Sequence, residues 1–87
     1  MASGTVLEDL KRAAWARSSP VSSANAWDIR KDCLGNLVRY TDFANRHSPF
    51  GWELEYMGSQ EPDNLQALNW KAVAARSEHV APKSIAA

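Results

Sequence analysis

Four tryptophans stand in a chain of only 87 residues: Trp15, Trp27, Trp52 and Trp70. Each indole can bury about 150–250 Å² of surface, so a few of them supply much of a small hydrophobic core. A chain this short forms one domain around one core, and its net stability is small. We therefore expect the tryptophans to lie mainly in the core. A platform on which nucleic-acid bases stack is the less frequent alternative.

Charge and cysteine content exclude several classes of protein. Ten Lys and Arg residues balance ten Asp and Glu residues, which argues against a protein that grips phosphate backbones without sequence preference. Cys33 is the single cysteine, so no internal disulfide can form; with His47 and His79 it cannot complete a structural zinc site. No apolar run reaches the length of a membrane span. We expect a cytoplasmic protein without a cofactor or a membrane partner.

The N-terminal segment has the pattern of an amphipathic helix. Thr5 and Glu8 have the spacing of a capping box, which predicts a helix over residues 6–17. Trp15 lies off the apolar stripe of this helix, so we expect it to be partly exposed or to cover a second contact. Residues 18–26 are rich in serine and are predicted to form a loop. The predicted stripe consists of Val6, Leu7, Leu10, Ala13, Ala14 and Arg17.

The middle of the chain predicts two β-strands. A turn around Gly35 precedes the β-prone residues 37–40, and a polar loop is expected over 41–51. Residues 52–56 then alternate strictly between apolar and acidic, which is typical of a half-buried strand. We expect the two strands to form a hairpin-like pair joined by the long loop. The apolar face of the second strand consists of Trp52, Leu54 and Tyr56.

The last part of the chain predicts a helix. After a short loop over 58–62, Asp63 can cap a helix over about 64–78. The tail from Val80 is expected to be frayed. The expected helix stripe consists of Leu65, Leu68, Ala72 and Ala75. The predicted parts of the chain are a helix with its connector over 1–26, a main domain over 27–79 and a flexible tail over 80–87.

Three blocks of the sequence resemble a known family. Residues 27–39, the block TDFANRHSPFGWEL at 41–54 and the block DNLQALNW at 63–70 are similar, in this order, to small bacterial and phage HNH endonuclease domains. Those domains typically carry the blocks G-W-E-I-D-H-I and N-L-Q-P-L-H-W. The resemblance implies an α+β fold, namely a small ββα unit to which this chain adds an N-terminal helix.

The departures from the family pattern lie at its catalytic and metal-binding positions. In the family, the histidine that ends the first block is the general base; Tyr56 takes its place here, and a tyrosine is almost fully protonated at neutral pH. Glu55 replaces an aspartate that binds the metal. Asn64 is retained and is implied to hold the connecting loop. The helix asparagines of the metal site fall on Ala72 and Val73, neither of which can bind a metal.

Each remaining candidate has an ordinary structural alternative. Tyr56 is expected to fill core space, and the carboxylates of Glu53 and Glu55 are expected to be solvated, although they could bind a cation. His47 and His79 could supply a displaced base, but their spacing does not indicate it. Cys33 is interpreted as a small buried hydrophobic residue. The basic residues of a DNA-facing surface, or else scattered surface charge, are Arg39, Arg46, Lys71 and Arg76.

The sequence therefore predicts a non-catalytic, HNH-like small protein that acts by binding. We expect it to regulate or inhibit a nucleic-acid-processing protein partner, an expectation that depends on the family resemblance. The alternatives are a weak divalent-metal-dependent nuclease and direct DNA binding without cleavage. No catalytic or metal-binding residues are assigned. The former active-site positions are Glu55, Tyr56, Asn64 and Val73.

Overall fold

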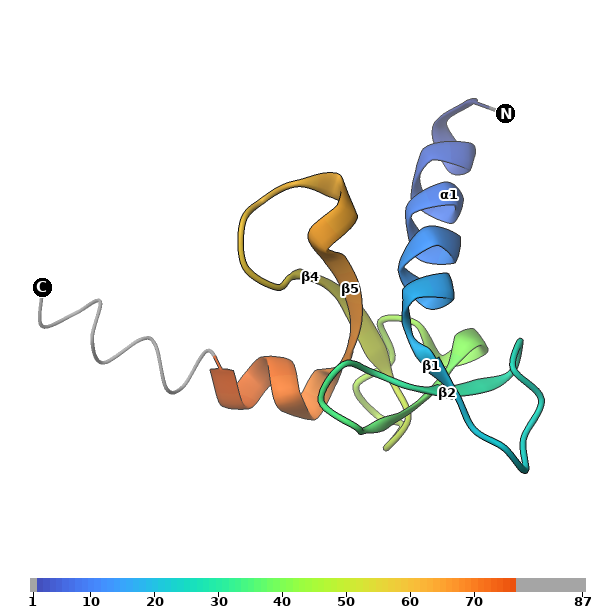
Figure 1. Ribbon diagram of the computed structural model, residues 1–87. Helices are drawn as coiled ribbons and strands as arrows, with labels where there is room; N and C mark the ends of the chain where they lie inside the picture. Colours follow the sequence, from blue (N-terminus) through green and yellow to red (C-terminus); the bar gives the residue numbers. More distant parts are fainter. Residues whose placement is uncertain (1, 77–87) are drawn as a thin grey trace, which may run out of the picture.

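The first half of the molecule is a long helix followed by a small three-stranded sheet. The computed structural model describes residues 2–76, and Figure 1 shows how the elements are arranged. The sheet is antiparallel throughout, in the order β1-β2-β3. A helix in this region was predicted and is confirmed. The elements are α1 (Ala2–Arg17), β1 (Ser19–Pro20), β2 (Ile29–Lys31) and β3 (Leu37–Arg39).

The second half is a two-stranded hairpin followed by a helix. Strands β4 and β5 pair antiparallel, with Trp52 opposite Asn69 and Tyr56 opposite Leu65. Helix 70–76, orange in Figure 1, continues directly from β5. The class of the fold is therefore α+β, as the sequence predicted. The elements are the 3-10 turn η1 (Tyr40–Asp42), β4 (Trp52–Tyr56), the 3-10 turn η2 (Pro62–Asn64) and β5 (Leu65–Asn69).

Two sequence predictions about the second half are wrong. The helix expected over 64–78 begins only at residue 70, because 65–69 form β5 and hydrogen-bond to β4. The expected pairing of strands 37–40 and 52–56 is also wrong, since β3 pairs with β2 and β4 with β5. The two sheets nevertheless touch: the Asn69 side-chain nitrogen of β5 donates to the Leu37 carbonyl of β3 at 2.9 Å. The predicted end of the last helix and the tail from Val80 lie outside the described residues.

The N-terminal segment also differs in detail from the expectation. Helix α1 begins at Ala2, so Thr5 lies inside the helix and is not its N-cap. Residues 19 and 20, expected to be loop, form strand β1 against β2. Most of the predicted apolar stripe faces solvent, with Val6, Leu7 and Leu10 all exposed. The N-terminal half of the stripe therefore lies beyond the core, whereas Ala14, on the same stripe, is fully buried.

The core is built around Trp52, whose side chain is fully buried. Its ring lies 5.3 Å from Trp15 and 4.9 Å from Phe43, centroid to centroid, and the Phe43 contact is edge-on. The Trp52 indole N–H donates to the Arg39 carbonyl at 2.8 Å, so burial leaves its polar atom paired. The hydrophobic core, as we use the term below, comprises Trp15, Val38, Trp52 and Ala67 with the partly buried Tyr40, Phe43 and Leu54.

Trp15 is a core residue, so of the two outcomes expected for it, partial exposure is wrong. Only 7% of it is exposed, and its ring packs edge-on against Tyr40 at 5.2 Å. Its indole N–H donates to the Ala26 carbonyl at 3.0 Å, which ties the loop after β1 to the helix. The apolar stripe did not predict the burial of Trp15, because a stripe takes account of one helix alone. Burial here depends on two aromatic partners that are distant in sequence.

Gly51 allows the backbone before β4 to pass close to the preceding loop. A Cβ atom at this position would overlap the carbonyl oxygen of Asn45, so no larger residue fits without movement of the backbone. The Gly51 carbonyl accepts from the Trp70 amide at 3.0 Å, which fixes the start of helix 70–76 beside the loop. Within residues 2–76, no helix combines the length and the apolar character that a membrane span needs.

Candidate functional site

The positions that the resemblance identifies lie on the β4–β5 hairpin and on the helix that follows it. Glu55 and Tyr56 are the last residues of β4, and Asn64 directly precedes β5. Val73 lies on helix 70–76. The four positions thus lie on β4, on the turn η2 before β5, and on the helix that follows β5.

The carboxylate of Glu55 faces a guanidinium group. Arg76 Nη1 lies 3.8 Å from Glu55 Oε1, and the same nitrogen donates to Met57 Sδ at 3.1 Å. Both side chains of the ion pair are about one-third to two-fifths exposed, so the pair is solvated and its energy is small. A partly exposed guanidinium therefore lies beside the Glu55 carboxylate.

Tyr56 does not fill core space, contrary to the expectation from the sequence. It is 40% exposed, because it is the last residue of β4 and lies beyond the hydrophobic core. The predicted alternation of buried and exposed residues holds at the first residue of β4, Trp52, and is lost toward the tip of the hairpin. Tyr56 is therefore a surface phenol.

Asn64 binds the loop that joins β4 and β5. Its side-chain amide donates to Ser59 Oγ at 2.7 Å and to the Ser59 carbonyl at 3.2 Å. The Asn64 carbonyl also accepts from the Met57 amide at 3.0 Å, which closes the loop across its base. Asn64 thus has the contacts that the resemblance implies for it.

The residues at these positions do not fit a bound divalent metal. Val73 is buried and has no donor atom, and the neighbouring Ala72 is apolar and half-buried. Glu55 would be the one carboxylate donor, and it already faces Arg76. Across residues 2–76, no cluster of three or more His, Cys, Asp or Glu side chains is arranged to hold a metal ion.

Three of the four basic residues singled out from the sequence form ion pairs with carboxylates. Arg39 Nε lies 3.6 Å from Asp28 Oδ1, and Arg76 pairs with Glu55 as described. Arg46 makes a two-pronged contact with Glu53, with Nε–Oε2 at 2.6 Å and Nη2–Oε1 at 2.9 Å. Lys71 is exposed and has no ion pair within the described part of the chain.

The Arg46–Glu53 pair is the best-formed of these contacts. The hydrogen bonds from Arg46 lower the pKa of the Glu53 carboxyl, and those to Glu53 raise the pKa of Arg46. Arg46 and Lys71 both lie near the ring of Trp70, at 5.8 Å and 5.9 Å from its centroid. The basic residues therefore neutralise this chain's own carboxylates and cover one of its indoles.

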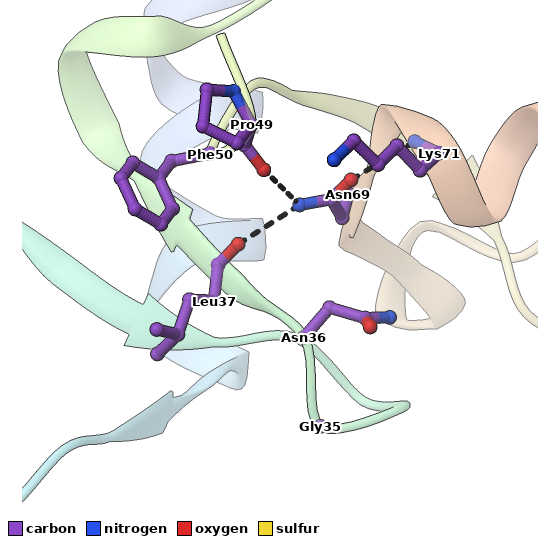
Figure 2. Close-up of a pocket in the computed structure, with 7 residues that line it drawn as sticks. All are labelled: Gly35, Asn36, Leu37, Pro49, Phe50, Asn69 and Lys71. Atoms are coloured by element: carbon purple, nitrogen blue, oxygen red, sulfur yellow. Dashed lines mark hydrogen bonds between the residues drawn. The ribbon is translucent and has the colours of Figure 1, made fainter.

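A pocket of about 330 Å³ opens between the turn before β3, the loop before β4 and the start of helix 70–76 (Figure 2). Asn69 lies at its base: its amide nitrogen donates to the carbonyls of Leu37 and Pro49, both at 2.9 Å. Its side-chain oxygen accepts from the Lys71 amide at 2.9 Å. The pocket is lined by Gly35, Asn36, Leu37, Pro49, Phe50, Asn69 and Lys71.

Asp32 and Asn69 form a structural centre that sequence reasoning missed. The buried Asp32 carboxylate accepts from the amides of Leu34 and Asn36 within its own turn, at 3.0 and 2.7 Å. It also accepts from the Asn69 amide at 2.9 Å. The turn itself was predicted from the residues around Gly35. The bond to Asn69 crosses between the two sheets, and local sequence carries no signal for it.

The remaining candidates from the sequence are a cysteine and two histidines, and none of them is placed as a nucleophile or a base in the described part of the chain. Cys33 is exposed rather than buried, which corrects the expectation. Partial desolvation, with the charge of Asp32, raises the pKa of its thiol, so the thiol stays protonated at neutral pH. His47 is exposed on the loop before β4. His79 lies outside the described residues.

Comparison with protein-family models, with curated proteins and with solved structures finds no match for this chain.

Proposed function

We propose that this chain is a non-catalytic protein with an HNH-like framework, which acts by binding and regulates or inhibits a nucleic-acid-processing protein. The observation that carries the proposal is the Arg76–Glu55 contact beside Tyr56. A one-metal nuclease needs a base, a metal and a held phosphate together. Here a phenol stands in the place of the base, and the one carboxylate at these positions, Glu55, lies beside a guanidinium.

The paired basic residues support binding to a protein rather than to DNA. Affinity for a phosphate backbone comes from cations that are free to replace counterions. Arg39, Arg46 and Arg76 each lie within 4 Å of a carboxylate, which would have to be displaced or left beside the phosphates. The net charge of zero offers no long-range attraction that would compensate.

The exposed apolar residues of α1 support a protein partner as well. Val6 is 62% exposed, and Leu7 and Leu10 are also open to solvent. They lie at helical spacing in the N-terminal half of α1, beyond the point at which Ala14, on the same stripe, is buried. Contiguous exposed apolar surface is typical of protein-binding faces.

A nicking assay tests the proposal. The pure protein is incubated with supercoiled plasmid and magnesium, manganese or EDTA, and both nicking and gel mobility are followed. We expect no metal-dependent nicking and no gel shift, because a lost general base alone costs about 10²–10⁴-fold in rate. Magnesium-dependent nicking that disappears in Glu55→Ala would overturn the proposal in favour of a nuclease. A gel shift without nicking, abolished in Lys71→Ala, would overturn it in favour of DNA binding.

Two variants distinguish the missing general base from the missing metal ligands as the cause of inactivity. Tyr56→His restores only the imidazole, and we expect it to remain inactive because Arg76 still faces Glu55 and Val73 still lacks a donor. The combined change Tyr56→His, Glu55→Asp and Val73→Asn is the minimal rebuild of the family pattern. Nicking by the single variant would show that a metal site exists and would contradict the placement of its ligands.

A further inference from the structure

A second pocket, of about 320 Å³, lies between the C-terminal half of α1 and the loop that joins β1 to β2. Its lining is almost entirely apolar and comes from three aromatic rings and one cation: Trp15, Trp27, Tyr40 and Arg12. We call it the Trp27 pocket. Its volume is at the lower end of the range for small ligands and for peptide side chains, about 300–1,000 Å³.

The loop that carries Trp27 is held firmly, although Trp27 itself is not covered. The Asn25 carbonyl accepts from the amides of Asp28 and Ile29, both at 2.9 Å, which closes a tight turn around Trp27. The adjacent Ala26 carbonyl accepts from the Trp15 indole at 3.0 Å. Trp27 is nevertheless 80% exposed. A tryptophan on a fixed backbone with an open ring is a preorganised anchor for a ligand.

The polar atoms of Trp15 and Tyr40 in the pocket already form hydrogen bonds within the protein. The Trp15 indole binds Ala26, and the Tyr40 hydroxyl donates to Glu8 at 3.3 Å. Within residues 2–76, the Trp27 indole N–H has no hydrogen-bond acceptor and Arg12 has no carboxylate within ion-pair distance. A ligand would therefore meet three aromatic rings, together with an indole N–H and a guanidinium that no described side chain pairs.

These groups select among ligand classes. A cationic ligand, which aromatic cages often bind, is disfavoured by Arg12. A nucleic-acid strand is disfavoured because the acids Glu8 and Asp28 flank the pocket and would lie beside its phosphates. The Lys11 ammonium lowers the pKa of Glu8, so this carboxylate is ionised at neutral pH. A single carboxylate opposite Arg12 meets this repulsion once, whereas a nucleic-acid strand meets it at every phosphate.

An extended proline-rich segment matches all of these features. In the polyproline II conformation the backbone makes no internal hydrogen bonds, so its carbonyls are free to accept from an indole N–H. Its rings pack into grooves lined by aromatic side chains at low entropic cost. We propose that the Trp27 pocket binds a polyproline II segment of a partner protein that carries an acidic residue opposite Arg12.

A titration followed by nuclear magnetic resonance of the indole N–H groups tests this inference. The probes are a short synthetic proline-rich peptide with one glutamate, its lysine counterpart, a glycine–serine peptide with the same glutamate, and oligothymidylate. We expect the glutamate-containing proline peptide to shift the Trp27 indole resonance and to leave that of Trp70 in place, since Trp70 already donates to the Ser48 carbonyl. Trp27→Ala, which identifies the resonance, should weaken binding by about tenfold or more.

A charge exchange supplies the matched control. Arg12 is exposed, so Arg12→Glu should fold like the parent and should bind the lysine peptide more tightly than the glutamate peptide. Leu34→Ala, another exposed apolar residue outside the pocket, should leave binding unchanged. The inference is overturned if neither proline peptide shifts Trp27 at millimolar concentration, if the glycine–serine peptide binds equally well, if Trp27→Ala binds like the parent, or if oligothymidylate binds Trp27 more tightly.

The inference names the kind of partner and therefore rests on the proposed binding function, but the two fail separately. Plasmid nicking together with peptide binding would overturn only the proposed function. Absence of both nicking and peptide binding would overturn only the Trp27 pocket as the binding site.

Discussion

The two ends of strand β4 have opposite surroundings. At its first residue, Trp52 is fully buried against Trp15 and Phe43. At its last residue, Tyr56 is 40% exposed, beside the solvated pair of Glu55 and Arg76. One strand of only five residues thus joins the hydrophobic core to the candidate site. Residues at the open end are free to change their chemistry, because the fold depends on the buried end.

Trp52→Ala should have the largest effect on this contrast. It removes a fully buried indole and leaves a cavity, which costs about 3–5 kcal/mol. That is close to the whole stability of many domains of this size, so we expect a largely unfolded chain in circular dichroism melts. Tyr56→Ala, at the other end of the strand, is the control and should change the free energy of unfolding by about 0.5 kcal/mol or less. A Trp52→Ala protein that melts like the parent would place the core elsewhere.

Trp15→Ala should rank next. Its indole is 7% exposed and contributes both to the core and to the bond with Ala26, so we expect a loss near the lower end of about 3–5 kcal/mol. Urea denaturation of this variant and of Trp27→Ala measures the difference between a buried and an exposed indole. Trp27→Ala should lie within about 0.5 kcal/mol of the parent. Equal losses in the two variants would contradict the packing of α1.

Asp32→Ala should have an intermediate effect. It leaves the amides of Leu34, Asn36 and Asn69 without their acceptor, and a buried donor that loses its partner costs about 1–3 kcal/mol. The Leu34 and Asn36 amides lie close to water, so we expect a total of about 2–3 kcal/mol. Asp32→Asn keeps one acceptor oxygen and should lose less in the same urea experiment. A larger loss in Asp32→Asn than in Asp32→Ala would contradict the view that the hydrogen bonds of Asp32 stabilise the fold.

Glu53→Gln should have the smallest effect, and that effect should depend on pH. Arg46 lowers the pKa of Glu53 in the folded state below its ordinary value of 4.5. The pair therefore stabilises the fold above about pH 4.5, and this contribution is lost as pH falls through the lowered pKa. The difference in melting temperature between parent and variant should be present at about pH 7 and shrink toward about pH 3. A difference that is constant over this range would show that the pair does not stabilise the fold.

Local pattern predicted the elements that have a clear alternation or turn chemistry of their own. The alternation over 52–56 located β4, and the residues around Gly35 located the turn that Asp32 stabilises. Residues 65–69 were misread because Leu65 and Leu68 fit a helical period as well as a strand. Pairing with β4 decides the outcome, and this pairing is a tertiary interaction.

The candidate site was predictable in position but not in its contacts. The resemblance identified Glu55 and Tyr56 by their place in the sequence. The approach of Arg76 to Glu55 depends on how helix 70–76 leaves β5, which no local pattern encodes. The Trp27 pocket was missed for the same reason, since its walls come from α1, the loop after β1 and η1.

The bonds of Asp32 have a consequence for the kinetics of folding. Its bonds to Leu34 and Asn36 close loops of two and four residues, whereas its bond to Asn69 joins residues 37 apart. Short loops close quickly, and contacts distant in sequence form later. The turn between β2 and β3 can therefore form before the β4–β5 hairpin docks on it. The side-chain nitrogen of Asn69 bonds the carbonyls of Leu37 and Pro49, which are also distant in sequence, so removing this side chain should speed unfolding and leave the refolding rate nearly unchanged.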